Sequence, residues 1–232
     1  MTLPRPFVLI NAAMTADGKL DTVARRGAQI SSEDDWQRVD ALRAASDAIL
    51  VGGRTLLDED PRLLVKSAER RSARAARGLP KNPAKVGIVS LADLGPESRF
   101  LSAGPARRIL YTTPRTSITQ TRRLEEAGAE VYFMGSERVD LVAALRHLHE
   151  LGFRKVMVEG GGTLIAELLR LGLADELHLY IAPLIFGGAA APTLADAGGM
   201  SRDEAVRLER LGLDLFDDGG IVVRYEIIKS IK

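Results

Sequence analysis

Residues 155–171 read KVMVEGGGTLIAELLRL, and this stretch decides the fold. It opens with an apolar run at residues 156–158, a pattern typical of a strand buried on both faces of a parallel sheet. Glu159 ends the run, three glycines follow, and from Leu164 the apolar residues recur at helical spacing. The stretch therefore predicts a strand, a glycine turn and a helix, with Thr163 as the expected helix cap.

The glycine turn has two interpretations, which the local pattern supports about equally. In the first, the glycines allow positive φ and close approach of a ligand, and the helix N-terminus offers N–H groups and positive dipole to a phosphate. In the second, the segment is an ordinary tight turn. Ile165 stands where a Gly-x-Gly-x-x-Gly motif requires glycine, and no Gly-Lys-Ser/Thr is present, so a standard Rossmann turn and a P-loop are both excluded.

Composition limits the possible partners. The 232 residues are expected to form a single domain, residues 1–232, and the formal net charge of +1, from 32 basic and 31 acidic residues, gives no general attraction to nucleic acid or membrane. The absence of cysteine excludes disulfides, thiolate nucleophiles and cysteine-bound zinc. The three histidines form no recognised metal spacing, so no metal site is expected. Without a signal peptide or a long apolar run, a cytoplasmic location is expected.

Strands and helices are predicted to alternate along most of the chain. Ser32 and Asp35 resemble a capping box for a helix that ends near Ala45, and Thr55 is predicted to cap a short helical turn. Residues 66–85 are strongly basic and are interpreted as an exposed loop or short helix, with a solvated face about three times as probable as a phosphate site. Strands are predicted at residues 7–14, 48–51, 86–89, 109–111, 131–133 and 156–158, and further helices at residues 139–151 and through Leu124.

The C-terminal third is predicted to add antiparallel strands. Residues 176–183 alternate polar and apolar side chains, which predicts a strand with one exposed face. Residues 208–216 and 221–228, joined by Asp-Asp-Gly-Gly, predict a hairpin. The whole pattern indicates an α/β fold with a mostly parallel sheet, helices on both faces and a C-terminal antiparallel hairpin.

Four motifs in order give the chain a family resemblance. They are NAAMTADGKL (11–20), ISSEDDW (30–36), ALRAASDAILVGGRTLLDEDPRL (41–63) and VEGGGTLIAELLRLGLADELHLYIAPLIFGG (158–188). Together they resemble the riboflavin-biosynthesis reductase family over nearly the whole chain. The resemblance implies a dihydrofolate-reductase-like fold, NADPH as cofactor, and reduction of the ribosyl group of a pyrimidine ribosylamine 5′-phosphate to a ribityl chain.

The resemblance also implies site residues. The residues that look like NADPH contacts are Thr55, Glu59, Gly160, Gly161, Gly162, Thr163 and Leu164. The residues that look like substrate contacts are Asn11, Arg43, Leu63, Lys66 and Glu159. This division fits the chemistry, because Arg43 and Lys66 could hold a phosphate and Glu159 could accept hydrogen bonds from sugar hydroxyls. The alternative for Arg43 is a solvated helix residue.

Three positions depart from the family pattern. Glu59 stands where the family usually has Asp, Leu64 replaces a Thr in the Asp-Pro-Arg-Leu-Thr-Val pattern, and Gln29 stands where some relatives have Trp. These departures concern the choice of substrate, so the diamino and the deaminated pyrimidine both remain open.

In the expected reaction the ribosylamine opens to an imine, C1′ accepts a hydride and the nitrogen accepts a proton. Glu159, Asp17 or a bound water could donate that proton, and the sequence does not choose among them. Two alternatives are a paralogue that reduces another pterin-like or imine substrate and a nucleotide-binding module without catalysis. With no cysteine for a deaminase zinc site, deamination is not expected. A homodimer is expected, because the apolar residues 177–186 are predicted to end a sheet.

Overall fold

The computed structural model describes residues 4–228, which divide into two compact units. Within the described residues, unit 1 comprises residues 4–6 and 40–157, and unit 2 comprises residues 7–39 and 158–228. Helix α1 (Glu33–Ala44) begins in unit 2 and ends in unit 1. Ser32 caps this helix by accepting a hydrogen bond from Asp35 N at 3.2 Å, which confirms the predicted start, and the end at Ala44 lies one residue from the predicted one.

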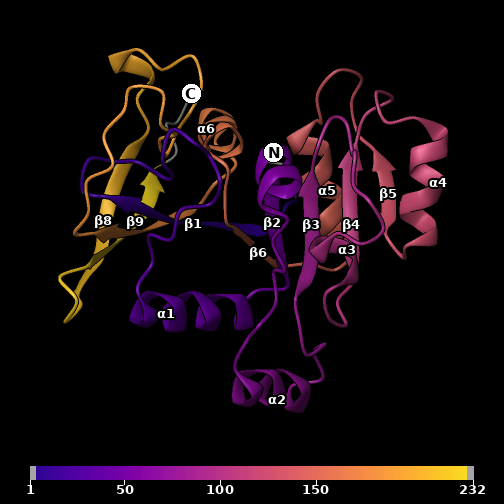
Figure 1. Ribbon diagram of the computed structural model, residues 1–232, viewed down its shortest axis with the longest axis horizontal. Coiled ribbons are helices and arrows are strands. Elements are labelled where there is room, and N and C mark those ends of the chain that lie inside the picture. The colour runs from indigo at the N-terminus through magenta and orange to yellow at the C-terminus, as the bar shows by residue number, and fades with distance from the viewer. Residues whose placement is uncertain (1–3, 229–232) are drawn as a thin grey trace. The chain divides into compact units, whose positions relative to one another are not determined.

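Unit 1 has the strand order β5-β4-β3-β2-β6, in which β5, β4, β3 and β2 pair in parallel. The strands are β2 (Ala48–Gly52), β3 (Ala84–Ile88), β4 (Arg108–Thr112), β5 (Glu130–Phe133) and β6 (Lys155–Val158), the last of which ends in unit 2. The helices are α2 (Ala68–Ala76), α3 (Arg99–Ser102), α4 (Ile118–Glu126) and α5 (Leu141–Glu150), with a π-helical turn at Thr55–Glu59. Figure 1 shows β3, β4 and β5 side by side, with α4 next to β5.

Helices cover both faces of the sheet in unit 1, as predicted. Leu110 of β4 packs in an apolar cluster with Phe100 of α3 and Leu124 of α4. Tyr111, the next residue along β4, points to the opposite face because side chains alternate along a strand. Its hydroxyl lies 2.9 Å from His147 Nδ1 of α5. Helices α3 and α4 therefore lie on one face and α5 on the other.

Unit 2 has the strand order β1-β7-β9-β8 and is partly antiparallel. Its strands are β1 (Phe7–Thr15), β7 (Glu176–Ala182), β8 (Arg207–Leu215) and β9 (Ile221–Ile228), and its helices are α6 (Gly162–Arg170) and a 3₁₀ turn at Arg202–Glu204. β1 and β7 are parallel, whereas β7–β9 and β9–β8 are antiparallel. The predicted C-terminal hairpin is thus confirmed, as is the mostly parallel α/β fold.

Strand β7 corrects two predictions. Its His178 and Tyr180 are 9% and 1% exposed, so the alternation of polar and apolar residues does not mark an exposed face. A histidine and a tyrosine carry large ring surfaces, and burial of those rings outweighs the cost of their polar atoms. β7 is also paired on both sides, with β1 and β9, so residues 177–186 do not end the sheet. In unit 2 that position belongs to β8.

The basic segment 66–85 contains the predicted short helix and is mostly exposed as predicted, but two of its cations, Arg74 and Lys85, are buried. Residues 68–76 form α2, and Arg74 is buried, donating hydrogen bonds to the carbonyls of Ala44, Ser46 and Pro80 at 2.8 Å each. Lys85 is fully buried, and its ammonium donates to the carbonyls of Phe100 and Ala103 at 3.0 and 2.6 Å. Burial lowers the pKa of Lys85 to about 8. These cations bind main-chain carbonyls, which local charge patterns in a sequence do not reveal.

Candidate functional site

The glycine turn in unit 2 joins β6 to α6. Gly160 is buried and has φ of 128°, a conformation that favours glycine, and the Gly160–Gly161 peptide bond is cis. Gly161 is the N-cap of α6, and no side chain caps the helix. Thr163 lies inside the first turn, so its prediction as the cap is wrong. The N–H groups of that turn are therefore left without a side-chain acceptor, the arrangement that suits a phosphate.

Gly162 has a different role from the one predicted for the glycines. A Cβ at this position would collide with Thr193 O and would lie 3.2 Å from Asp196 Cβ. Asp196 N also donates to Gly162 O at 3.2 Å, and Asp196 Oδ1 accepts from the Thr193 hydroxyl at 2.7 Å. Gly162 thus admits the protein's own loop, residues 193–196, rather than a ligand. Of the neighbouring site residues, Thr163 is exposed, Glu159 is half-buried and Leu164 is buried.

Asn11 lies in a buried polar layer of unit 2. It is 6% exposed on β1, opposite His178 of β7, and its Oδ1 has no hydrogen-bond partner within the described part of the chain. His178 Nε2 lies 3.2 Å from Glu176 Oε2. Burial chiefly lowers the pKa of His178, and Arg38 and Arg224 act in the same direction while Glu176 opposes them. An unsatisfied buried amide oxygen is costly, which marks Asn11 as a place where a polar ligand or water could bind.

Asp17 anchors a loop. Its carboxylate accepts hydrogen bonds from the Thr15 hydroxyl at 2.5 Å, from Gly187 N at 2.7 Å and from Phe186 N at 3.3 Å. The Thr15 hydroxyl chiefly lowers the pKa of Asp17, and the two backbone N–H groups act in the same direction. These bonds favour the charged form, so the environment of Asp17 suits a structural acceptor better than a proton donor.

Two predicted cofactor residues lie on the π-helical turn of unit 1. Thr55 begins this turn and is 8% exposed, and Glu59 ends it and is exposed. The N-cap is Arg54 and no side chain caps the turn, so Thr55 does not act as the predicted cap. Asp60 follows with φ of 44° and accepts hydrogen bonds from Arg99 N and Phe100 N at 2.6 and 2.9 Å. Single π-helical turns are frequent at functional sites, which agrees with a role in ligand binding.

Unit 1 also brings together three predicted substrate residues. Arg43 of α1 is 9% exposed and donates from Nη1 to Leu64 O at 3.0 Å. Leu63 is buried and has φ of 48°, and Lys66 is exposed three residues later. Asp40, which sequence reasoning missed, accepts from the backbone N–H groups of Lys66 and Ser67. No local signal could have found it, because its partners lie 26 and 27 residues away.

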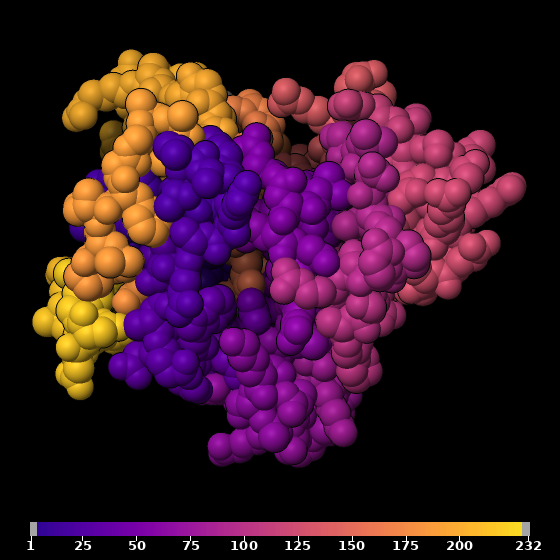
Figure 2. All heavy atoms as spheres, in the orientation of Figure 1, coloured from indigo at the N-terminus to yellow at the C-terminus, as the bar shows by residue number. Residues whose placement is uncertain are grey.

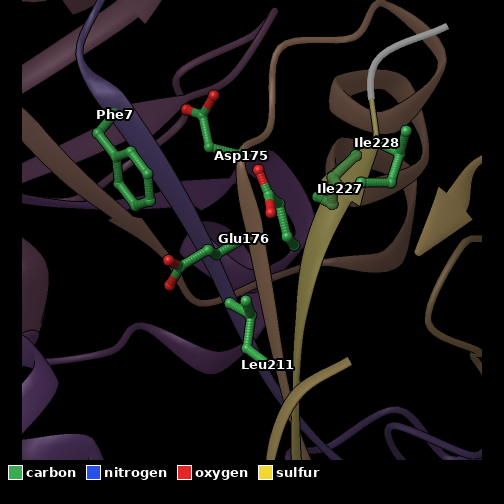
Figure 3. A pocket seen from close by; sticks show the side chains of 7 residues that line it. Phe7, Asp175, Glu176, Leu211, Ile227 and Ile228 are labelled. Atoms are coloured by element: carbon green, nitrogen blue, oxygen red, sulfur yellow. The ribbon is translucent and has the colours of Figure 1, made fainter. Parts of the chain in front are cut away.

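A hollow of about 510 Å³ in unit 2 lies apart from these residues. Its lining consists of Phe7, Asp175, Glu176, Leu211, Glu226, Ile227 and Ile228. Figure 3 shows Phe7, the carboxylates of Asp175 and Glu176, and Leu211 around it. None of the predicted site residues lines this hollow.

The fold and these sites define an α/β protein with a glycine turn at the end of strand β6, between that strand and a helix. The chain belongs to the family described as the RibD C-terminal domain, whose model matches residues 6–222.

Relatives of the chain are named as reductases. This chain is 41% identical over 209 residues to a 2,5-diamino-6-ribosylamino-4(3H)-pyrimidinone 5′-phosphate reductase of Archaeoglobus fulgidus. The match covers 90% of this chain and 94% of the relative. The reductase of the same name from Methanothermobacter thermautotrophicus is also 41% identical, with 88% and 91% covered. The resemblance to riboflavin-biosynthesis reductases is thereby confirmed, and a reductase family implies a nicotinamide cofactor.

Solved structures confirm the fold. A pyrimidine reductase-like protein from Corynebacterium diphtheriae has a TM-score of 0.83 at 24% identity, covering 97% of this chain and 93% of that one. Acinetobacter baumannii RibD has a TM-score of 0.79 at 22% identity, covering 97% of this chain and 59% of that one. Among the described residues, no helix is both long and apolar enough to cross a membrane.

Proposed function

We propose that this chain uses NADPH to reduce the ribosyl group of a pyrimidine ribosylamine 5′-phosphate to the ribityl form, in the cytoplasm, as a step of riboflavin biosynthesis. The observation that carries the proposal is the 41% identity to the archaeal reductase over nearly the whole of both chains. The uncapped start of α6 and the buried, unpartnered Asn11 Oδ1 supply groups suited to a phosphate and to a polar ligand.

We assign NADPH contacts within each unit separately, each on that unit's own observations. In unit 2 they are Gly160, Gly161, Gly162, Thr163 and Leu164. In unit 1 they are Thr55 and Glu59. The first turn of α6 fits a cofactor phosphate because its N–H groups have no side-chain cap and Gly161 presents no Cβ. Gly162 would contribute its N–H, since the space beside its Cα is filled by residues 193–196.

The substrate contacts are assigned to Asn11, Arg43, Leu63, Lys66 and Glu159. Lys66 is an exposed cation on a loop whose main-chain N–H at Lys66 donates a hydrogen bond to the Asp40 carboxylate, which suits a phosphate. Glu159 is half-buried where β6 ends and could accept hydrogen bonds from ribose hydroxyls.

NADPH supplies the hydride, which C1′ of the ring-opened imine accepts while the imine nitrogen takes a proton. This chain's residues bind and orient the sugar and its phosphate. Between the two carboxylates considered as proton donors, Glu159 is the better candidate, because hydrogen bonds hold Asp17 in its charged form.

Turnover by the purified chain tests the proposal. The diamino ribosylaminopyrimidinone phosphate and its deaminated counterpart are each mixed with NADPH, and cofactor oxidation is followed together with the mass of the product. We expect NADPH oxidation matched by ribityl product with at least one of the two. If neither substrate accelerates NADPH oxidation, the proposed function is wrong. Oxidation with an unrelated imine alone would favour the paralogue.

Gly161→Val tests the cofactor site. A branched side chain at the N-cap of α6 would obstruct approach to the first-turn N–H groups, so NADPH binding should be abolished. Fluorescence titration measures the Kd, with Gly198→Val as the control because a Cβ there meets nothing within 4 Å. A change below threefold in Kd, about 0.65 kcal/mol, would move the cofactor site elsewhere.

We also propose that the protein is a homodimer, with β8 in place of residues 177–186 as the pairing surface. β8 ends the strand order of unit 2 and exposes Leu208, Leu211, Leu213 and Leu215. The C-terminal hairpin reaches the surface in Figure 2, where it is yellow. An exposed edge strand rich in leucine invites pairing with another chain, and the apolar side of the hollow adjoins it at Leu211.

A further inference from the structure

The loop formed by residues 63–67, here called the clasped loop, has an unusual conformation. It belongs to no helix or strand, and Leu63 adopts φ of 48°, which is rare for a side chain of this size. Leu63 and Val65 are each 1% exposed, so they point inward. Lys66 is exposed. The loop therefore has one buried side and presents one cation on the other.

Side chains from three segments bind the main chain of the clasped loop. Arg43 Nη1 donates to Leu64 O at 3.0 Å, and Asn82 Oδ1 accepts from Val65 N at 3.1 Å. Arg71 Nη1 of α2 donates to Val65 O at 2.7 Å and to Lys66 O at 2.6 Å. Asp40 of α1 accepts from Lys66 N at 2.5 Å and from Ser67 N at 3.1 Å. Every one of these six main-chain groups thus has a side-chain partner.

The partners of Asp40 show that this carboxylate is held in its charged form. Burial alone would raise its pKa, but the Lys66 and Ser67 N–H groups and Arg70 hold the pKa of Asp40 below its usual value. Arg70 Nη1 lies 3.0 Å from Asp40 Oδ2. Ser67 in turn caps α2 by accepting a hydrogen bond from Arg70 N. Asp40 therefore fixes the clasped loop where it enters α2.

A surface loop normally leaves such groups to water, and its conformation then varies. Here both main-chain groups of Lys66 are bound, its N–H by Asp40 and its carbonyl by Arg71. Fixing both sides of one residue removes most of its backbone freedom, and its side chain then leaves the loop in a defined direction. A cation held in this way binds a phosphate with a smaller entropy loss than one on a mobile loop.

We propose that Asp40 and Arg71 are positioning residues that hold the Lys66 ammonium in place for the 5′-phosphate of the substrate. The inference rests on the proposed function, which assigns that phosphate to Lys66. Neither residue is expected to touch the substrate, and both act through the main chain of the clasped loop.

The main test compares Arg71→Ala, Lys66→Ala and the double variant. Steady-state rates are measured with NADPH and the phosphorylated pyrimidine, and again with the same nucleoside lacking its 5′-phosphate. Arg71→Ala should raise the KM for the phosphorylated substrate about tenfold, and change the KM for NADPH and for the dephosphorylated compound less than twofold. The double variant should be no worse than Lys66→Ala, because Arg71 acts through Lys66. Arg77→Ala, which removes the same charge from an exposed position at the end of α2, should behave as the wild type.

Hydrogen exchange is a second measurement, and it does not depend on turnover. It keeps the inference testable if the Arg71→Ala variant folds poorly. Asp40→Asn keeps the side-chain shape but removes one acceptor, so hydrogen exchange in peptides covering residues 64–68 should accelerate at least tenfold. Hydrogen exchange in the same peptides should be unchanged in Arg77→Ala. In the kinetic test, Arg71→Lys should reverse part of the rise in KM that Arg71→Ala causes.

The possible results separate the two ideas. If the wild type does not reduce the phosphorylated substrate, the proposed function is wrong. Unchanged hydrogen exchange in Asp40→Asn would then show that Asp40 does not fix the clasped loop. If Lys66→Ala alone leaves the KM unchanged, the phosphate assignment and the inference fall together. If Lys66→Ala raises the KM but Arg71→Ala and Asp40→Asn do not, or if the Arg71 and Lys66 losses simply add, the inference is wrong while the proposed function stands.

Discussion

Gly162 is buried at the start of α6, and main-chain atoms of Thr193 and Asp196 occupy the space beside its Cα. Glycine runs at strand ends are commonly interpreted as ligand sites. Here each of the three glycines has a different structural role. Gly160 supplies a positive φ, Gly161 leaves the helix start uncapped, and Gly162 admits a neighbouring loop. At the residue scale, the glycine motif therefore has a packing role beside the cofactor-binding role that we propose for it.

Gly162→Ala should destabilise the protein. The added methyl collides with backbone rather than with a flexible side chain, so the loop must move, and we expect a loss of about 1 to 3 kcal/mol in the free energy of unfolding. Urea denaturation measures this loss. Gly198→Ala, with nothing within 4 Å of its added Cβ, is the matched control and should change stability little. Equal stability of the two variants would contradict the packing role of Gly162.

His178 should make stability depend on pH. Because burial lowers its pKa below 6.5, the folded protein keeps His178 neutral while the unfolded chain takes up a proton at about pH 6.5 and below. The unfolded state then binds more protons, so the free energy of unfolding falls as pH falls through this range, by at most about 1.4 kcal/mol per pH unit from one residue. His178→Gln should flatten the curve of unfolding free energy against pH, measured by urea denaturation between pH 7 and 5. An unchanged slope in His178→Gln would rule this source out.

At the element scale, local patterns predicted most of the fold and few of the long-range contacts. The strand at residues 156–158, the Ser32 cap and the C-terminal hairpin follow from periodicity and turn residues, and all three are confirmed. The burial of Arg74 and the role of Asp40 do not follow, because the partners of these two side chains are main-chain groups distant in the sequence. The candidate site residues came from family motifs, and only the structure shows how four side chains bind the clasped loop.

Arg74 joins α2 to the residues at the end of α1 by hydrogen bonds and should contribute strongly to stability. Its guanidinium satisfies the carbonyls of Ala44, Ser46 and Pro80, so Arg74→Ala leaves three acceptors without this donor. We expect a loss of about 2 to 4 kcal/mol in the free energy of unfolding. Arg77→Ala, at the exposed C-cap of α2, is the control, and equal midpoints of urea denaturation for the two variants would show that the buried bonds contribute little.

At the scale of the whole molecule, the strand order of unit 2 moves the expected surface for pairing with a second copy from residues 177–186 to β8. A strand bonded on both sides, as β7 is, has no main-chain groups left for another chain, whereas β8 is bonded to β9 alone in that order. Along β8 the charged residues are Arg207, Glu209, Arg210 and Asp214, so its first half carries a net charge of +1 and its second half −1, although Asp214 also pairs with Arg224 of β9 at 3.3 Å. Two copies related by a two-fold axis and paired antiparallel would bring opposite charges together, which favours an isologous dimer.

Substitution of exposed leucines on β8 tests this dimer directly. Leu213 is 49% exposed and Leu215 74%, so changing both to Asp removes apolar contact surface without disturbing a buried side chain. Light scattering at micromolar concentration should give twice the chain mass of 25.1 kDa for the wild type and the mass of one chain for the double variant. Ile118→Asp, at an exposed position on α4, is the control and should leave the dimer intact. A wild-type mass of one chain would reject the homodimer, and a double variant that remains dimeric would move the interface away from β8.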